Sequence, residues 1–159
     1  MQHDAMRRPV LIRRPMRSLC AIALAVLGAA VLAGCERDAA PSAQTLALGR
    51  RVYDAQCAAC HGAKLEGQPD WRTRGVNGRL PAPPHDATGH TWHHADQALF
   101  EITKHGVQHF AGADYATDMP AFDGRLSDDE IRAAIAYIKS TWPEQIRAKQ
   151  AQIDAQARR

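Results

Sequence analysis

The segment QCAACHG, at positions 56–62, places two thiols and an imidazole close together. Cys57 and Cys60 are separated by two alanines, and His61 follows directly. This spacing is typical of three kinds of site: a redox-active dithiol, one half of a zinc site, or the attachment point of a c-type haem. In the third, both thiols lie on one face of a helical turn and form thioethers, and His61 binds the iron.

The first 34 residues have the pattern of an export signal. A basic segment precedes an uncharged, apolar run of 15 residues at positions 19–33. That length suits a signal peptide and falls short of the roughly 17–25 apolar residues that a membrane-spanning helix needs. We therefore predict that residues 1–34 are a signal peptide of the lipoprotein type. The pair Arg7-Arg8 leaves a twin-arginine signal as an alternative.

The apolar run ends in Leu32-Ala33-Gly34-Cys35, which resembles the lipobox of bacterial lipoproteins. The resemblance implies that Cys35 is lipidated, becomes the mature N-terminus and anchors the chain on the periplasmic side of a membrane. An ordinary cleaved signal, with Cys35 incidental, is the alternative. Residues 35–44 are small and polar with one proline, so we expect a tether between the lipid and the domain.

Removal of the signal simplifies both the charge and the cysteine count. Five arginines and one aspartate leave with residues 1–34, so the mature chain has 15 basic and 16 acidic residues. The basic residues are scattered, which gives no support to nucleic-acid binding. Apart from Cys35, only Cys57 and Cys60 remain, too few for a four-cysteine zinc site. A thioredoxin-like dithiol would need a βαβ context that the chain lacks, so haem attachment is favoured.

Residues just before the cysteine motif predict a helix. Apolar side chains recur at three- and four-residue spacing over about 45–56. Gly49 lies inside this pattern, where it costs about 1 kcal/mol relative to alanine, and this suggests the close approach of another backbone. Residues 62–91 show no sustained period. A loop of this length is unusual in a compact domain, and a large buried cofactor would organise it.

Two further helices are expected in the second half of the chain. The first is short, at residues 96–104. The second follows Ser127, which forms a capping box with Glu130 and precedes an apolar stripe that ends at Trp142. Residues 143–159 are polar, and we expect them to form an exposed or frayed extension. No β-sheet is expected.

A haem iron in such a protein usually takes a second axial ligand, and Met119 is the only methionine that remains after signal cleavage. A second histidine is the alternative, and it would lower the reduction potential relative to a His/Met pair. The other histidines of the mature chain are His85, His90, His93, His94, His105 and His109. The trio His90, His93 and His94 falls within five residues, so a second copper or zinc site is a further hypothesis. The alternative interpretation is that these three histidines are polar surface residues or that they contact the haem propionates.

From about Leu46 to Trp142 the chain resembles the monohaem class I c-type cytochromes. The resemblance rests on CAACH at 57–61, on DMPAF at 118–122, and on the helical patterns at the two ends. It implies an all-α cytochrome c domain at 45–142, with short helices and long loops wrapped around one covalent haem c. In that fold the first and last helices cross. The matching residues at the crossing are Gly49, Tyr53 and Tyr137.

The resemblance also assigns contacts to the haem. The two cysteines of the CAACH motif would form the thioethers, and His61 and Met119 would be the axial ligands of the iron. In this family a proline carbonyl accepts the Nδ1–H of the proximal histidine and fixes its orientation. Pro83 is the best match, with Pro81 and Pro84 as alternatives.

The function that the resemblance implies is one-electron transfer, without enzymatic activity of the chain itself. Such a carrier meets redox protein partners through small, transient interfaces. One alternative is a subunit of a larger respiratory or oxidoreductase complex. Others are an enzyme or gas sensor with an open haem site, and a metal-handling protein that uses His90, His93 and His94.

Overall fold

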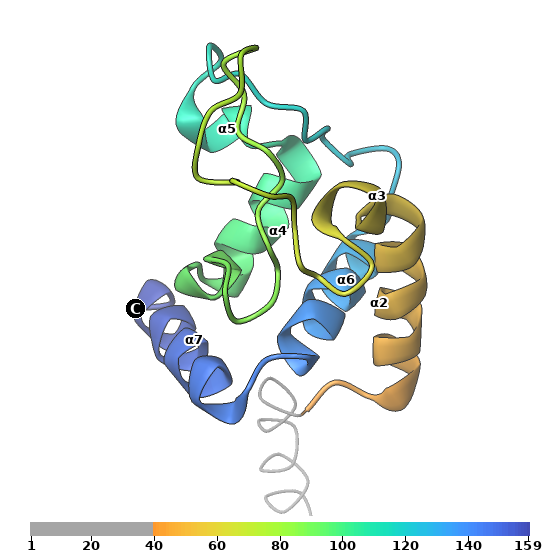
Figure 1. Ribbon diagram of the computed structural model, residues 1–159. Coiled ribbons are helices and arrows are strands. Elements are labelled where there is room, and N and C mark those ends of the chain that lie inside the picture. Colours follow the sequence, from red (N-terminus) through yellow and green to blue (C-terminus); the bar gives the residue numbers. More distant parts are fainter. Residues whose placement is uncertain (1–39) are drawn as a thin grey trace, which may run out of the picture. The chain divides into compact units, whose positions relative to one another are not determined.

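The computed structural model describes residues 40–159, which fold into helices joined by loops (Figure 1). The helices are α2 (Ala43–Gln56), α3 (Ala58–His61), the 3₁₀ helix η3 (Thr91–His93), α4 (Asp96–His105), α5 (Gln108–Ala111), α6 (Asp128–Ser140) and α7 (Glu144–Ala157). No strand occurs between residues 40 and 159, in agreement with the all-α class predicted from the sequence. The expected signal peptide and Cys35 lie outside the described residues.

Helix α2 begins earlier than the apolar pattern predicts. The backbone N–H of Thr45 donates to Ser42 Oγ at 3.1 Å, so the helix starts at Ala43. A serine at this position satisfies one of the free amides of the first helical turn. The predicted boundary of the tether at residue 44 is therefore two residues too late, because Ala43 and Gln44 belong to the helix.

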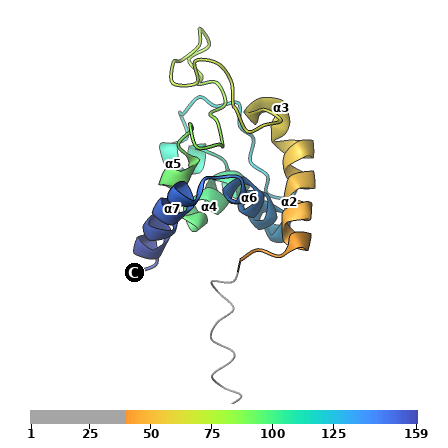
Figure 2. The same cartoon turned by 60° about the horizontal axis from the view of Figure 1, so that its bottom comes forward.

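Helices α2 and α6 cross in direct contact, as Figure 1 and Figure 2 show. A Cβ atom on residue 49 would lie 2.0 Å from the backbone oxygen of Ala133, so the crossing requires Gly49. One turn further along α2, the rings of Tyr53 and Tyr137 meet with their centroids 5.7 Å apart. These contacts confirm the expected crossing and give the physical reason for a glycine inside a helix.

Helix α6 begins with the capping box that the sequence predicts. The N–H of Glu130 donates to Ser127 Oγ at 3.3 Å, and the N–H of Ser127 donates to Glu130 Oε2 at 2.9 Å. The N–H and the hydroxyl of Ser127 both donate to Glu130 Oε2 and lower the pKa of that carboxyl, since they favour its charged form. The start of the helix is therefore fixed by two residues only three positions apart in the sequence.

The apolar side of α6 connects two buried clusters. The first, called the Phe cluster, contains Phe100, Phe122 and Ile131. The second, called the Tyr cluster, contains Tyr53, Leu65, Ile138 and Trp142. Ile131 lies in the first turn of α6, and Ile138 lies near its end. One helix therefore holds both clusters at a fixed separation.

The C-terminal residues form a packed helix, and the expectation of an exposed or frayed extension is wrong. Helix α7 extends from Glu144 to Ala157, within the same compact unit as the rest of residues 41–159. The side chains of Gln150 and Asp154 are buried, at 1% and 7% exposed. The most buried side chains of this helix are polar, so the weak apolar pattern of the segment gave little sign of its packing.

Both buried side chains of α7 reach the start of α4. The N–H of Asp96 donates to Asp154 Oδ1 at 2.9 Å, whereas Ala95, at the N-cap position, has no side-chain acceptor. Gln150 Nε2 donates to Asp96 Oδ1 at 2.7 Å and to the carbonyl of His94 at 3.2 Å. Helix α7 thus supplies, from 58 residues away, the cap that the local sequence of α4 lacks.

No helix among residues 40–159 combines the length and the apolar character needed to cross a membrane.

We expect Asp154→Ala to lower the free energy of unfolding by about 1–2 kcal/mol, because it removes a helix cap and a buried hydrogen-bond acceptor. Urea unfolding of the cofactor-loaded protein, followed by far-UV circular dichroism, measures the loss. Gln152→Ala, at an exposed position on the same helix, is the control and should stay within about 0.5 kcal/mol of the parent. Equal stability of Asp154→Ala and the parent would contradict the capping role.

Candidate cofactor-binding site

The CAACH motif forms a short helical turn that continues α2. The amide N–H groups of Cys60 and His61 both donate to the carbonyl of Cys57, at 3.1 and 2.9 Å. The Tyr53 hydroxyl donates to the carbonyl of Gly62 at 2.8 Å and approaches that of His61 at 3.3 Å. Burial raises the pKa of Tyr53, so its hydroxyl remains a donor. The tyrosine at the helix crossing therefore also fixes the turn that carries the motif.

The two thiols differ in exposure and form no disulfide with each other. Cys57 is half-buried and packs against the Tyr cluster, whereas Cys60 is exposed. Burial, with a smaller effect from Cys60, raises the pKa of the Cys57 thiol to about 11. Redox-active dithiols instead have a cysteine with a lowered pKa, because the thiolate is the reactive form. The environment of Cys57 therefore disfavours the dithiol interpretation.

The imidazole of His61 is buried and oriented by one hydrogen bond. Its side chain is 8% exposed, and Nδ1 lies 2.8 Å from the carbonyl oxygen of Pro83. A carbonyl can only accept, so Nδ1 carries the hydrogen and Nε2 keeps its lone pair. Burial lowers the pKa of His61, while the bond to Pro83 opposes this effect. The ring is therefore neutral at neutral pH and presents a metal-binding nitrogen.

A glycine allows Pro83 to approach this closely. Gly67 has φ +68°, and a Cβ at this position would lie 2.4 Å from the Pro84 nitrogen and 2.7 Å from the Pro83 carbonyl carbon. Its N–H donates to the carbonyl of His61 at 2.8 Å. The loop at 62–91 thus returns to the motif at a position where a side chain would keep it away. The sequence analysis did not single out Gly67.

Met119 lies in the segment between α5 and α6 and packs on the Phe cluster. It is half-buried, and its N–H donates to Thr117 Oγ1 at 3.1 Å. Cys57 packs on the Tyr cluster, so the two proposed sides of the cofactor site belong to different clusters joined by α6. His61 and Pro83 are therefore in contact with each other, whereas Met119 packs on the Phe cluster, which contains neither of them.

Two polar contacts connect the loop at 62–91 with the segment before Met119. Arg79 forms an ion pair with Asp118. The Arg74 guanidinium lies 5.3 Å from the centre of the Tyr115 ring. Sequence reasoning missed both contacts, because they join residues about 40 positions apart in segments without regular structure.

The histidines at positions 90, 93 and 94 do not converge on a metal site. The ring of His93 stacks on Trp92 at 3.6 Å, and His90 stacks on Trp71 at 5.4 Å. Within residues 40–159 no group of three or more histidine, cysteine or acidic side chains could hold a metal ion. The hypothesis of a second copper or zinc site at these histidines is therefore wrong, because the His90 and His94 rings meet at 5.4 Å but no third ligand within residues 40–159 completes a site with them.

Trp92 has the one buried side-chain nitrogen or oxygen that lacks a hydrogen-bond partner in the described part of the chain. Its indole Nε1–H is fully buried, while its ring packs beside the Tyr cluster. Buried donors in folded proteins nearly always have an acceptor. A cofactor that carries a carboxylate would provide one, so this donor fits a site that receives a group with acidic substituents.

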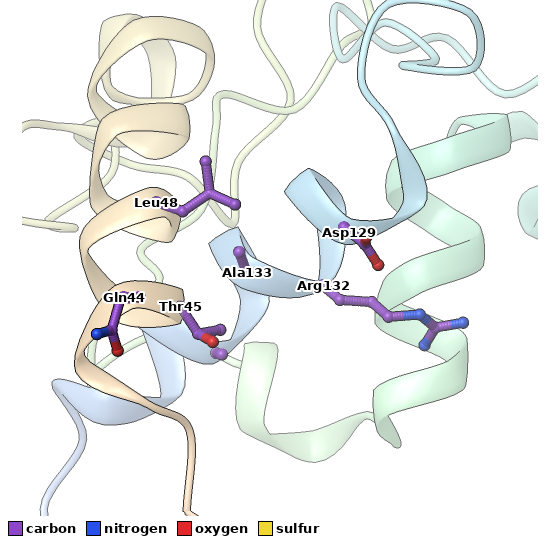
Figure 3. Close-up of a pocket in the computed structure, with 7 residues that line it drawn as sticks. Gln44, Thr45, Leu48, Asp129, Arg132 and Ala133 are labelled. Carbon is purple, nitrogen blue, oxygen red and sulfur yellow. The ribbon is translucent and has the colours of Figure 1, made fainter.

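The surface groove between α2 and α6 is a separate feature (Figure 3). Its lining residues are Gln44, Thr45, Leu48, Asp129, Arg132, Ala133 and Ala136. None of them belongs to the predicted site, so this groove is not where the motif would hold its cofactor.

Comparison with known proteins gives the family. The cytochrome c family matches residues 46–142. A cytochrome c6 of Picosynechococcus sp. is 34% identical over 128 residues, which cover 77% of this chain and 92% of the relative. A cytochrome c-555 of Prosthecochloris aestuarii is 35% identical over 99 residues, or 58% of this chain and 84% of the relative. No solved structure matches.

The matched range contains the helix crossing, the CAACH turn, the loop that brings Pro83 to His61, and the segment of Met119. The fold and the site geometry agree with the match over that whole range. The chain therefore belongs to the cytochrome c family, and its cofactor is covalently bound haem c.

Proposed function

We propose that this electron-transfer protein carries one haem c with His61 and Met119 as axial ligands, and that a lipid on Cys35 anchors it on the periplasmic side of a membrane. The observation that carries the proposal is the hydrogen bond from His61 Nδ1 to the Pro83 carbonyl, at 2.8 Å. It leaves Nε2 of a neutral, buried imidazole free for iron, directly after the two cysteines of the motif.

The residues around the site suit one-electron transfer. The haem supplies an iron that alternates between Fe(III) and Fe(II). Cys57 and Cys60 would hold the haem covalently, and the bond to Pro83 would keep His61 in one orientation in both oxidation states. Met119 packs on the buried Phe cluster, so a thioether ligand from this segment would sit in apolar surroundings. A methionine ligand raises the reduction potential relative to a second histidine.

Three of the other histidines pack their rings against aromatic side chains. His85 stacks on the His61 ring itself, with the centroids 4.0 Å apart, so no haem plane fits between the two rings. His90 and His93 stack on Trp71 and Trp92. This arrangement supports the proposal that Met119 is the second ligand.

The Trp92 indole would contact the polar edge of the haem. Its buried N–H lacks a partner within the described chain, and the propionate groups of haem are the acceptors that the cofactor brings. A hydrogen bond from this donor to a carboxylate would be charge-assisted and therefore strong. The side chain would thus fix the haem at a point remote from the thioethers.

Met119→Ala is expected to keep the covalent haem and to lose the weak long-wavelength absorption band that ferric haem shows when a methionine sulfur is bound. The reduction potential should fall, and the ferrous protein should bind CO. Leu126→Ala, which removes apolar volume beside the same cluster, should keep the band. Absence of the band from the unsubstituted oxidised protein would refute His/Met ligation.

Trp92→Phe should lower the free energy of unfolding of the haem-loaded protein by about 1.5–3 kcal/mol, the range for hydrogen bonds to charged groups. It should also shift the propionate bending band in the resonance Raman spectrum. Trp71→Phe, at the half-buried tryptophan that stacks on His90, is the control and should leave that band in place. An unshifted propionate band in Trp92→Phe would exclude the contact.

Cys35→Ala in the full chain, produced in a bacterium that processes lipoproteins, should abolish labelling by radioactive palmitate and release the protein from the membrane fraction. Cys20→Ala is the matched control, because its flanking residues lack the lipobox pattern, and it should label normally. Labelling of Cys35→Ala, or none in the parent chain, would contradict lipid anchoring.

A further inference from the structure

A second histidine packs directly on the proposed iron ligand. The rings of His85 and His61 are stacked, with centroids 4.0 Å apart and planes inclined by 22°. His85 lies two residues after Pro83, so the segment that accepts the Nδ1–H of His61 also covers the face of its ring.

His85 is held on several sides by contacts that involve no cofactor. Its N–H donates to the carbonyl of Leu65 at 2.8 Å, and its own carbonyl accepts from Trp142 Nε1 at 2.7 Å. Its Nδ1 lies 2.8 Å from Thr91 Oγ1. The Tyr53 ring meets it edge-on at 6.2 Å. The position of the His85 ring is therefore set by both the Tyr cluster and the loop.

The backbone of Leu65 shows that this arrangement is maintained against local strain. Leu65 has φ 65°, in the left-handed region that residues other than glycine rarely adopt. In this conformation its carbonyl accepts the N–H groups of both His85 and Asp86, at 2.8 and 3.2 Å. Such strain persists where the surroundings over-determine the backbone, and it gathers at functional sites.

We infer that His85 is a positioning residue for His61, acting through the face of the ring. The bond from Nδ1 to Pro83 holds one edge of the ring, and the freedom that remains is a small rotation about the Cβ–Cγ bond of His61. Stacking against His85 removes this freedom and fixes the plane of the ring. The inference rests on the proposed function, since it assumes that His61 binds the haem iron.

The stack has an electronic consequence as well as a geometric one. The plane of an axial imidazole decides which iron d orbital its π electrons meet, so a fixed ring gives one well-defined electronic state. The His85 ring is also more polarisable than an aliphatic side chain. It therefore stabilises the more positive ferric state, and its loss should raise the reduction potential.

The test compares His85→Leu with His85→Phe in the haem-loaded protein at one fixed pH. Leucine removes the stacked ring, whereas phenylalanine keeps a ring without its hydrogen bond. His85→Leu should raise the potential enough to change the equilibrium with a one-electron reference dye at least fivefold, or about 41 mV at 59 mV per tenfold. It should also broaden or shift the g values of the ferric low-spin haem. His85→Phe should remain near the parent on both measures.

Two more variants keep the test decisive. His109→Leu, at an exposed histidine of α5, is the matched control and should change neither measure. Thr91→Val removes the partner of His85 Nδ1 at nearly constant volume and keeps the stacked ring, so, like His85→Phe, it should stay near the parent. If His85→Leu does not fold, His85→Ala, which also removes the stacked ring, takes its place.

Three results would overturn the inference. The first is a change of less than twofold in the dye equilibrium for His85→Leu with unchanged g values. The second is an equal change in potential for His85→Leu and His85→Phe, because loss of the hydrogen bond rather than loss of the stack would then explain it. The third is a shift of the potential in Thr91→Val as large as that in His85→Leu, because the hydrogen bond would then account for the effect. Failure of the proposed function would show separately, as the absence of the methionine-dependent long-wavelength band from the unsubstituted oxidised protein.

Discussion

The backbone contact between Gly49 and Ala133 is the constraint from which the rest of the site follows. It places α2 against α6 more closely than any side chain would allow. At that spacing Tyr53 reaches into the Tyr cluster, and its hydroxyl fixes the end of the CAACH turn through Gly62. The orientation of the cysteine motif thus depends on a helix that lies about 80 residues further along the chain.

From this turn, a second constraint extends into the loop at 62–91. Because Gly67 has no side chain, Pro83 can approach His61. The carbonyl of Leu65, whose backbone is strained, accepts the N–H of His85, and the His85 ring covers the same imidazole. The loop has only the short η3 as regular structure, yet its backbone is tied to the motif at several points. His61 is the proposed iron ligand, and a loop tied down at these points would hold its orientation when the haem is bound.

The features that were predicted correctly from the sequence depend on residues that lie close together in the chain. The capping box at Ser127, the apolar stripe after it and the glycine at the helix crossing all leave local patterns. The stack of His85 on His61 and the ion pair of Arg79 with Asp118 leave none. They depend on the path of loops, and a loop path is set by long-range packing rather than by local propensity.

Helix α7 shows the same limit in another form, and it extends the functional unit beyond the matched family range. The match ends at Trp142, but α7 caps α4 through Asp154 and packs Ile146 on the Tyr cluster. The Lys149 ammonium also lies 5.8 Å from the centre of the Trp92 ring. The Trp92 indole, whose N–H has no acceptor among residues 40–159, is therefore held in part by a helix outside the matched range. Truncation after residue 142 would remove support from the haem site as well as from α4.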